Sequence, residues 1–399
     1  MPPTIAQVSP ARRAAYAVVR RVLADDAWAD RALHGEARDL EPRDRQLAKQ
    51  LAFATVQRRL TLDHVIDART KGRLEPGVRA ALQLGLFQLL FLDRVAEHAA
   101  IAEAVELAKP SPGHRVVNAV LRRVQREGVE LPSDATPRGA AIRHSHPEWL
   151  VKLWWDVLGA DEARALLAAD NEPAELALRV NTLVDHDLSD IPGERDGDTI
   201  VVTGPFDALG HPGYAAGAFA PQSRASQRVA PMLGPLPGER TLDLCAAPGG
   251  KTTHLAALMD DEGDVVAVER HPGRARALRA TARRMRAESV RVVVADAKAF
   301  EDADGFDRVL LDPPCSGLGT LRSHPDLRWR VTPRTIRLLA AEQDALLQSA
   351  RRALRPGGTL VYSVCTISPG EERLRSDDAV RTYPHRDGTD GFYIARDGG

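Results

Sequence analysis

The sequence predicts an all-α N-terminal bundle followed by a C-terminal α/β domain with a doubly wound, mostly parallel sheet of the Rossmann-like type. Residues 10–128 carry apolar side chains three or four positions apart, the period of amphipathic helices. Residues 131–147 are rich in proline, serine and glycine, which indicates a linker. From Arg240 onward, short apolar runs alternate with glycine-rich turns and helical segments, which is typical of a parallel sheet covered by helices.

The helical prediction rests on three apolar series in residues 1–130. They comprise Ala15, Val18, Val19, Val22 and Leu23; then Leu47, Leu51, Ala54 and Leu60; then Leu82, Leu86, Leu89 and Leu90. Helices with such faces bury them against one another. Residues 1–130 are therefore expected to form one helical domain.

A small connecting subdomain is expected over residues 148–220. Two helices are predicted at 148–158 and 161–169, and a strand at 176–181, where apolar and polar residues alternate. Residues 185–218 are rich in loop-forming residues and indicate no particular element.

Five strands are expected in the last domain, residues 221–399. Their ranges are 240–245, 264–269, 290–296, 306–312 and 359–363. Parallel strands joined by helices bring their carboxyl ends to one edge of the sheet, where open α/β sheets bind their ligands.

Composition indicates an ordinary globular protein. Of the 399 residues, 44% are hydrophobic and 27% charged, and no apolar run approaches the ~20 residues that span a bilayer. The first residues lack the pattern of a signal peptide, so a cytoplasmic location is expected. Oligomerisation has no sequence signal, and a monomer is assumed.

The net charge of −1 gives no overall sign of a nucleic-acid partner. Arginines nevertheless cluster in the helical region, at positions 12, 13, 20, 21, 58, 59, 122, 123 and 126. These clusters fit either a phosphate-binding face or ordinary solvated helix surfaces.

The three cysteines, Cys245, Cys315 and Cys365, argue against a disulfide framework. Their spacing contains no CxxC pair and no matching histidine pattern, so no metal site is expected.

A glycine-rich turn after the first strand is the candidate cofactor site. It consists of Cys245, Ala246, Ala247, Pro248, Gly249, Gly250 and Lys251. A phosphate-binding P-loop would need glycine at position 245, which is cysteine here. Acidic residues end the next three strands, at Glu269, Asp296 and Asp312. An acid after the second strand suits ribose hydroxyls, and Asp296 could accept from an adenine amino group, although single strand-end acids are often helix caps.

Two cysteines follow neighbouring strands and are the candidate reactive groups. Cys315 lies in Asp312-Pro-Pro-Cys-Ser-Gly317, where the enzymes that methylate amino groups carry an aromatic residue, and Cys365 follows the fifth strand. Carbon 5 of cytosine is too weak a nucleophile to take a methyl group from a sulfonium ion unaided. A thiolate added at carbon 6 activates carbon 5, and this chemistry needs a cysteine. Two buried structural cysteines are the simpler alternative.

Together these segments resemble the RsmB/Sun (Fmu) family of ribosomal RNA cytosine-5 methyltransferases. The resemblance is carried by DLCAAPGGKTT, DPPCSGLGTLRSHPDLRW and YSVCTISPGEE, and upstream by HPEWLVKLW and LRVNTL. The first domain resembles NusB, in EAVELAK and VNAVLRRV.

The resemblance implies a function and a role for each site residue. The protein would use S-adenosylmethionine to methylate carbon 5 of a cytosine in RNA, with 16S ribosomal RNA as the expected substrate. Cys365 would add to carbon 6, Cys315 would assist breakdown of the product, and Asp312 would contact the base. The turn at 245–251 with Glu269, Asp296 and Asp312 would hold the cofactor, and the NusB-like domain would bind RNA.

The sequence departs from the family pattern at four places. Pro313 stands where the family has alanine, and Val364 stands where it has threonine. The regions 183–218 and 373–391 are shorter than usual. These shortenings bear on RNA docking more than on the chemistry.

Two alternatives remain open. The enzyme could act on transfer RNA, on DNA or on a nitrogen atom, and DNA cytosine-5 enzymes use the cysteine of the strand-four loop, which here is Cys315. The chain could also be a non-catalytic NusB-like RNA-binding factor, although the strand-end acids and both cysteines argue against that alternative.

Overall fold

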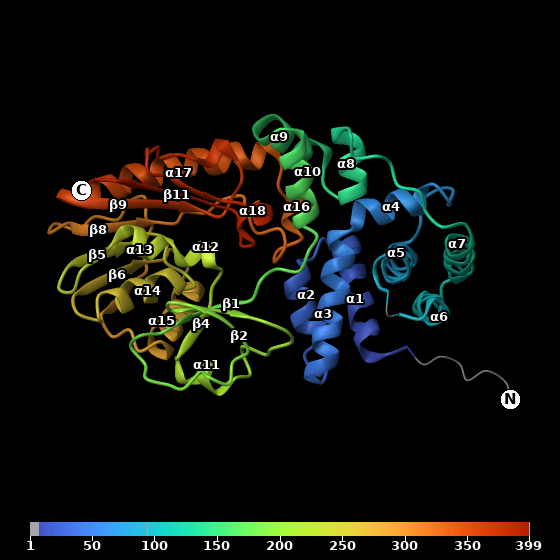
Figure 1. Ribbon diagram of the computed structural model, residues 1–399, viewed down its shortest axis with the longest axis horizontal. Coiled ribbons are helices and arrows are strands. Elements are labelled where there is room, and N and C mark those ends of the chain that lie inside the picture. The colour runs from blue at the N-terminus through green and yellow to red at the C-terminus, as the bar shows by residue number, and fades with distance from the viewer. Residues whose placement is uncertain (1–7, 94, 399) are drawn as a thin grey trace. The chain divides into compact units, whose positions relative to one another are not determined.

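The computed structural model describes residues 8–93 and 95–398, and Figure 1 shows its elements. The chain divides into two compact units. The helical unit extends to Glu172 and also contains His324–Arg330; the α/β unit contains Pro173–Ser323 and the chain from Val331 onward. The outer ends of the predicted domains, residues 1–7 and 399, lie outside the described residues.

The helical unit confirms the predicted all-α N-terminal bundle. Its helices are α1 (Pro10–Ala24), α2 (Ala29–Glu36), α3 (Pro42–Gln57), α4 (Arg59–Asp67), α5 (Pro76–Phe91), α6 (Glu97–Leu107), α7 (His114–Glu127), α8 (Pro137–His144), α9 (Glu148–Leu158), α10 (Ala160–Ala169) and α16 (Leu327–Arg330). The predicted apolar faces meet in one core, in which Val18, Leu51 and Leu82 are buried. Hydrophobic burial of this kind stabilises helices that would be marginal alone.

The stretch 131–147 contains a helix where only a linker was expected. Thr136 caps α8 through its hydroxyl, which accepts a hydrogen bond from the backbone N–H of Gly139, and Pro137 occupies the first helical position. Proline and threonine favour a helix start as well as a loop, so composition alone misled the prediction.

A four-stranded antiparallel sheet begins the α/β unit. Its strands are β1 (Ala177–Val180), β2 (Gly193–Asp196), β3 (Thr199–Val202) and β4 (Phe219–Pro221), in the order β2-β3-β1-β4, with helix α11 (Pro212–Ala216) in the connection. The region 185–218, which showed no clear pattern in the sequence, thus supplies two strands and a short helix.

A seven-stranded sheet forms the centre of the same unit, in the order β10-β11-β9-β8-β5-β6-β7. Its strands are β5 (Arg240–Asp243), β6 (Asp264–Val268), β7 (Val290–Val293), β8 (Phe306–Leu311), β9 (Leu354–Val364), β10 (Val380–Thr382) and β11 (Phe392–Asp397). The first five strands along the chain pair in parallel, and β10 and β11 pair antiparallel. The predicted doubly wound, mostly parallel sheet is confirmed.

Strand β9 begins at Leu354 and not at Thr359. The register between β8 and β9 shifts between Phe306 and Arg308, and Pro356 lies in this irregular part. Bulges accommodate proline inside a strand, which explains why the sequence predicted the strand only from Thr359.

Helices cover both faces of this sheet. They are α12 (Arg224–Gln227), α13 (Val229–Leu233), α14 (Gly250–Leu258), α15 (Pro272–Arg284), α17 (Pro333–Ala353) and α18 (Pro384–Asp387), with a 3₁₀ turn at Pro369–Glu371. Figure 1 shows α13, α14 and α15 on one face and α17 on the other. The parallel strands therefore all end at one edge, next to the N-termini of the helices that follow them.

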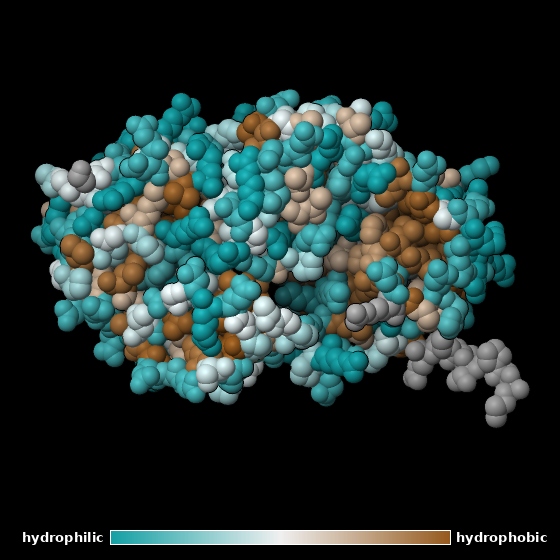
Figure 2. Space-filling model, in the orientation of Figure 1, coloured by the Kyte–Doolittle hydropathy of each residue, from teal (hydrophilic) through white to brown (hydrophobic). Residues whose placement is uncertain are grey.

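The surface is mostly hydrophilic in the view of Figure 2, with a hydrophobic area over α5 of the helical unit. Within the described part of the chain, no helix combines the length and the apolar composition that crossing a bilayer requires. The same residues contain no cluster of three or more histidine, cysteine or acidic side chains arranged for a metal ion.

Candidate active site

The two candidate reactive cysteines lie in contact at the carboxyl edge of the seven-stranded sheet. Cys315 follows β8, Cys365 follows β9, and their sulfur atoms are 3.3 Å apart. Both are half-buried free thiols. The pKa of Cys315 is raised well above its usual value by the hydrogen bond with Cys365, by burial and by nearby negative charge, so Cys315 is held as a thiol.

Asp312 lies beside the sulfur pair and is held by two donors. The Lys251 ammonium donates to Oδ2 at 2.7 Å, and the Ser363 hydroxyl donates to Oδ1, also at 2.7 Å. Burial lowers the pKa of Lys251, but the carboxylate of Asp312 outweighs this effect and the net shift is upward. Lys251 was predicted to bind a cofactor, and the structure places it on Asp312 next to the cysteines.

A buried carboxylate that the sequence did not single out joins the two cysteine loops. Glu371 accepts hydrogen bonds from the backbone N–H and the hydroxyl of Ser316, from the Thr366 hydroxyl and from the Gln343 amide. Ser316 follows Cys315, and Thr366 follows Cys365. The one available signal was that Glu371 is the penultimate residue of the YSVCTISPGEE motif, but a glutamate in a loop is ordinarily exposed.

The glycine-rich turn connects β5 to α14. Gly249 has a φ of +107° at the start of α14, and an added Cβ would lie 2.7 Å from a methyl carbon of Leu278, so only glycine fits. An added Cβ at Gly250 would meet nothing within 4 Å, so space is open beside the first helical N–H groups. The remaining predicted residues, Cys245 with Ala246, Ala247 and Pro248, precede these glycines in the turn.

Cys245 differs from the other two cysteines in its surroundings. Burial, followed by the negative charge of Asp243, Asp312 and other acids, raises the pKa of its thiol well above the ordinary range. Cys245 is therefore held as a thiol in the turn. The structure does not place it in the sulfur pair.

Asp243, the last residue of β5, is a further buried acid of the turn. Its Oδ2 accepts a hydrogen bond of 2.7 Å from the Thr252 hydroxyl, and burial raises its pKa to about 6. Asp243 opens the DLCAAPGGKTT motif, but no feature of the sequence marked it as a residue of the site.

The other strand-end acids lie at the same sheet edge. Glu269, after β6, accepts a hydrogen bond of 2.8 Å from the backbone N–H of His271 and pairs with Arg274 at 3.4 Å. Asp296, after β7, is exposed and accepts one from the backbone N–H of Lys298 at 3.0 Å. Both carboxylates keep free acceptor capacity, because an ionised carboxylate has about four lone-pair sites. Acids beside an open glycine turn fit an adenosine-type cofactor.

Arg179 links the small sheet to this turn and was not anticipated. Its guanidinium is buried and donates to the Thr253 hydroxyl in the first turn of α14 at 3.0 Å and to Gln222 Oε1 at 2.9 Å. Burial lowers its pKa to about 10. Arg179 thus fixes the position of β1 relative to the start of α14.

Comparison with known proteins places the chain among ribosomal RNA methyltransferases. Residues 230–381 match the family model 16S rRNA methyltransferase RsmB/F, residues 9–126 match the NusB family, and residues 146–186 match the ferredoxin-like domain of RsmF/B-like methyltransferases.

Individual proteins match over most of their length. The probable ribosomal RNA small subunit methyltransferase B of Synechocystis sp. is 37% identical, over 94% of this chain and 89% of the relative. Its counterpart of Vibrio cholerae is 32% identical, over 91% and 92%. A solved structure titled PH0851 has 26% identity and a TM-score of 0.81, and covers 98% of this chain and 99% of its own.

Proposed function

The chain belongs to the 16S rRNA methyltransferase RsmB/F family, and we propose that it transfers a methyl group from S-adenosylmethionine to carbon 5 of a cytosine in 16S ribosomal RNA. The observation that carries the proposal is the pair of sulfur atoms 3.3 Å apart beside Asp312 at the sheet edge. A cytosine-5 mechanism needs one thiol to add to the base and a second group to complete the release.

We assign the nucleophile to Cys365. Its thiolate adds to carbon 6, the electron pair of the carbon 5–carbon 6 double bond forms a carbon 4–carbon 5 double bond, and the carbon 4–nitrogen 3 pair moves onto nitrogen 3. Carbon 5 thereby becomes the nucleophilic carbon of an enamine. The Lys251 ammonium, which Asp312 keeps protonated, supplies positive charge near this thiolate. Asp312 can still accept from the exocyclic amino group of the base, since its two present donors leave lone pairs free.

S-adenosylmethionine, held by the turn at 245–251 with Glu269 and Asp296, supplies an electrophilic methyl group when bound. Carbon 5 then carries both the methyl group and its original hydrogen. Cys315 removes this proton, the double bond re-forms, and Cys365 leaves carbon 6 as a thiolate. The hydrogen bond and charge of Cys365, which raise the pKa of Cys315 in the free enzyme, disappear once Cys365 is a neutral thioether. Burial and the charges of Glu371 and Asp312 still raise the pKa of Cys315, so in this proposal its proton has to pass to solvent before Cys315 acts as the base.

The target cytosine must leave its base stack to reach the sulfur pair. The free-energy cost of this unstacking is a few kcal/mol, and it is lowest for bases in loops or damaged pairs. We infer that the helical unit binds RNA through its first domain, residues 1–130, and that residues 221–399 carry the methyltransferase chemistry. The stretches 131–147 and 148–220 lie between these two domains in sequence, and their part up to Glu172 packs within the helical unit. RNA binding through phosphates would weaken steeply with added salt.

The test is methyl transfer from labelled S-adenosylmethionine to unmodified 16S rRNA, with Cys365→Ala and Cys315→Ala beside the wild type. We expect the label in 5-methylcytidine for the wild type, no product and no adduct for Cys365→Ala, and a trapped protein–RNA adduct for Cys315→Ala. The reverse adduct pattern would make Cys315 the nucleophile. Binding of RNA without any affinity for the cofactor would favour a non-catalytic factor.

A further inference from the structure

A basic groove lies on the outer side of α15, along the edge strand β7. Its cavity has a volume of about 600 Å³ and is lined by the residues Arg279, Ala282, Arg283, Arg286, Ala287, Glu288, Val290 and Val292. The lining carries three arginines against one glutamate, a net charge of +2. None of these residues belongs to the sulfur pair or to the glycine-rich turn.

The arginines of the groove have no carboxylate partner among the described residues. Arg283 and Arg286 are exposed, and neither takes part in an ion pair that the structure records. Arg279 is half-buried and donates only to the backbone carbonyl of Val292, at 3.2 Å. Some exposed arginines of the same unit have carboxylate partners, as in Arg351–Asp397, Arg373–Asp344 and Arg381–Glu372, whereas others, such as Arg352 and Arg396, have none that the structure records. The groove therefore keeps uncompensated positive charge.

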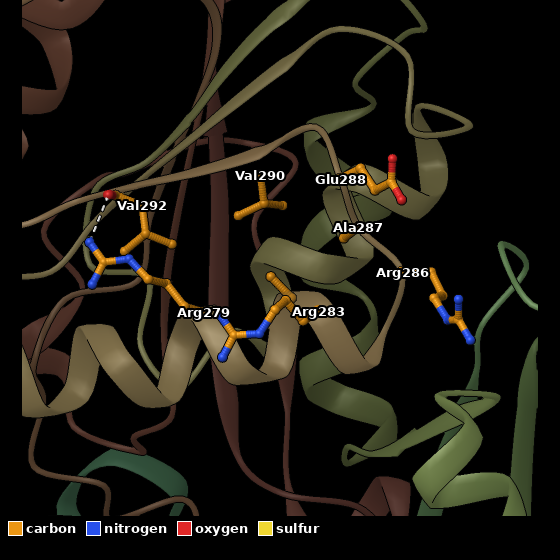
Figure 3. A pocket seen from close by; sticks show the side chains of 8 residues that line it. Arg279, Arg283, Arg286, Ala287, Glu288, Val290 and Val292 are labelled. Atoms are coloured by element: carbon orange, nitrogen blue, oxygen red, sulfur yellow. Dashed lines mark hydrogen bonds between the residues drawn. The ribbon is translucent and has the colours of Figure 1, made fainter.

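The spacing of the guanidinium groups indicates the shape of the anion. Figure 3 shows Arg279, Arg283 and Arg286 spaced along the groove and pointing in different directions, with Glu288 above them and between Arg283 and Arg286 in this view. A compact anion would need donors that converge on one point. A row of separated cations fits a chain of phosphates, and arginine is the side chain suited to contact them.

Local structure fixes two of the three positions. Arg283 lies in the last turn of α15, where a cation interacts favourably with the helix dipole. Arg286 follows the helix with a φ of +58°, a left-handed conformation that is uncommon for arginine. The neighbouring backbone is held by Asn181, whose amide donates to the carbonyl of Met285 at 2.7 Å. The backbone beside the groove is thus held in place by a contact from the residue that follows β1 of the small sheet.

We propose that this groove binds the phosphate backbone of the substrate RNA, away from the reactive cysteines. The inference rests on the proposed function and adds to it a path for the RNA that flanks the target cytosine. Contacts of this kind position the substrate and carry no sequence information. The alternative role of Arg279, shielding the free edge of β7, does not require Arg283 or Arg286.

The test uses the double variant Arg283→Gln/Arg286→Asn in the full chain. Glutamine is a good helix former, and asparagine tolerates the left-handed conformation better than most residues. The matched control is Arg352→Gln/Arg396→Gln, which removes the same charge from the last turn of α17 and from β11, with four strands between β11 and β7. The probe is a fluorescently labelled single-stranded RNA, titrated over a series of salt concentrations.

We expect the groove variant to bind this RNA about 5- to 10-fold more weakly than the control at low salt. The slope of log affinity against log salt should fall by about 1.4, since each contact to a single strand contributes about 0.7. Cofactor affinity and the thermal unfolding midpoint should match those of the control. Equal RNA affinity and equal salt slope in the two double variants would overturn the inference.

The groove and the proposed function can fail separately. If the wild type methylates no RNA but the groove variant still loses RNA affinity, the function fails and the groove stands. If the wild type methylates rRNA and the groove variant binds and methylates it like the control, the function stands and the groove fails.

Discussion

At the scale of single residues, the site depends on how charge is balanced around the cysteines. Lys251 and Asp312 form an ion pair with both side chains mostly buried, at 15% and 29% exposure. Such a pair contributes little net stability, but removal of one member leaves the other charge without a partner. Asp312 therefore has two roles in the proposal: it fixes Lys251, and it faces the base.

The substitution Asp312→Asn keeps the shape of the side chain and removes its charge. We expect methyl transfer to be lost, and stability to fall by about 1–3 kcal/mol because Lys251 loses its counter-charge. Urea unfolding and the methyl-transfer assay measure the two effects. Ser363→Ala is the matched control, because it removes only one hydrogen bond to the same carboxylate and should retain most activity. Wild-type turnover in Asp312→Asn would contradict the proposed role.

A second prediction at this scale concerns pH. His254 is buried in α14, and burial, followed by the charge of Arg179, lowers its pKa to about 3 from 6.5. The unfolded chain therefore binds the proton that the folded chain excludes, so stability is fully present above about pH 6.5 and is lost as the pH falls toward 3. The effect is on the order of 5 kcal/mol over this range, at about 1.4 kcal/mol per pKa unit.

The variant His254→Asn should show a shallower loss of stability between these pH values than the wild type. The free energy of unfolding is measured at several pH values by urea unfolding followed by circular dichroism. The buried His146 in the helical unit, whose pKa burial also lowers, remains in the variant and leaves part of the dependence. Parallel curves for the two proteins would show that His254 does not contribute.

At the scale of elements, the two cysteine loops are positioned by Glu371 and the helix α17. Gln343 of α17 donates from its amide to Glu371 at 3.1 Å and to the carbonyl of Pro314 at 2.9 Å. The Tyr362 hydroxyl, on β9, donates to the carbonyl of Glu371 at 2.7 Å. A long helix, a strand and both loops thus share one buried hydrogen-bond network, which restricts where the sulfur atoms can lie.

Glu371→Gln should loosen this network, because an amide presents a donor where the carboxylate accepts from Ser316, Thr366 and Gln343. We expect a loss of about 2 kcal/mol in stability, and a fall in kcat at unchanged KM for RNA. The alkylation rates of the two thiols are measured as well. At low temperature the variant stays folded, so a general loss of stability would leave these rates unchanged. Unchanged thiol reactivity and kcat would remove Glu371 from the positioning of the cysteines. Glu372→Gln, an exchange in the adjacent residue, is the control.

At the scale of the whole molecule, the chain enters the helical unit twice. Residues 324–330 belong to it although they follow the Cys315 loop in sequence. Arg328 is fully buried there and donates to the carbonyls of Gln57, Ser145 and Asp170 and to the side chain of Asn171. The indole N–H of Trp329 donates to the carbonyl of Val56 at 2.8 Å.

Arg328→Met should destabilise the helical unit by about 3 kcal/mol, because several buried carbonyls lose their donor. All five tryptophans lie in this unit, so tryptophan fluorescence follows its unfolding. Limited proteolysis should also cut the variant faster near residues 324–330. The control Arg334→Met changes an exposed arginine of α17 and should behave like the wild type. Equal fluorescence midpoints in the two variants would contradict the anchoring role.

Local patterns were sufficient to predict much of this molecule. The helical spacing of residues such as Val18 and Leu82 indicates which side of each helix is buried. The alternation of strands and turns from Arg240 onward indicates the parallel sheet. The positions of Cys315 and Cys365 after neighbouring strands followed from the same order, because parallel strands end at one edge. The helix α8 and the strands β2 and β3 were not predicted, since short elements with mixed composition leave no periodic signal.

The sequence by itself thus determined the two fold classes and the edge of the sheet where the candidate reactive cysteines lie. Only the tertiary structure decided that Lys251 pairs with Asp312, that Glu371 joins both cysteine loops, and that three arginines of α15 and its C-terminal turn line an unpaired basic groove. The physical reason is that helices and strands are determined by the local spacing of apolar residues and by the residues of the turns. Side-chain partners are determined by contacts between residues that are far apart in the chain.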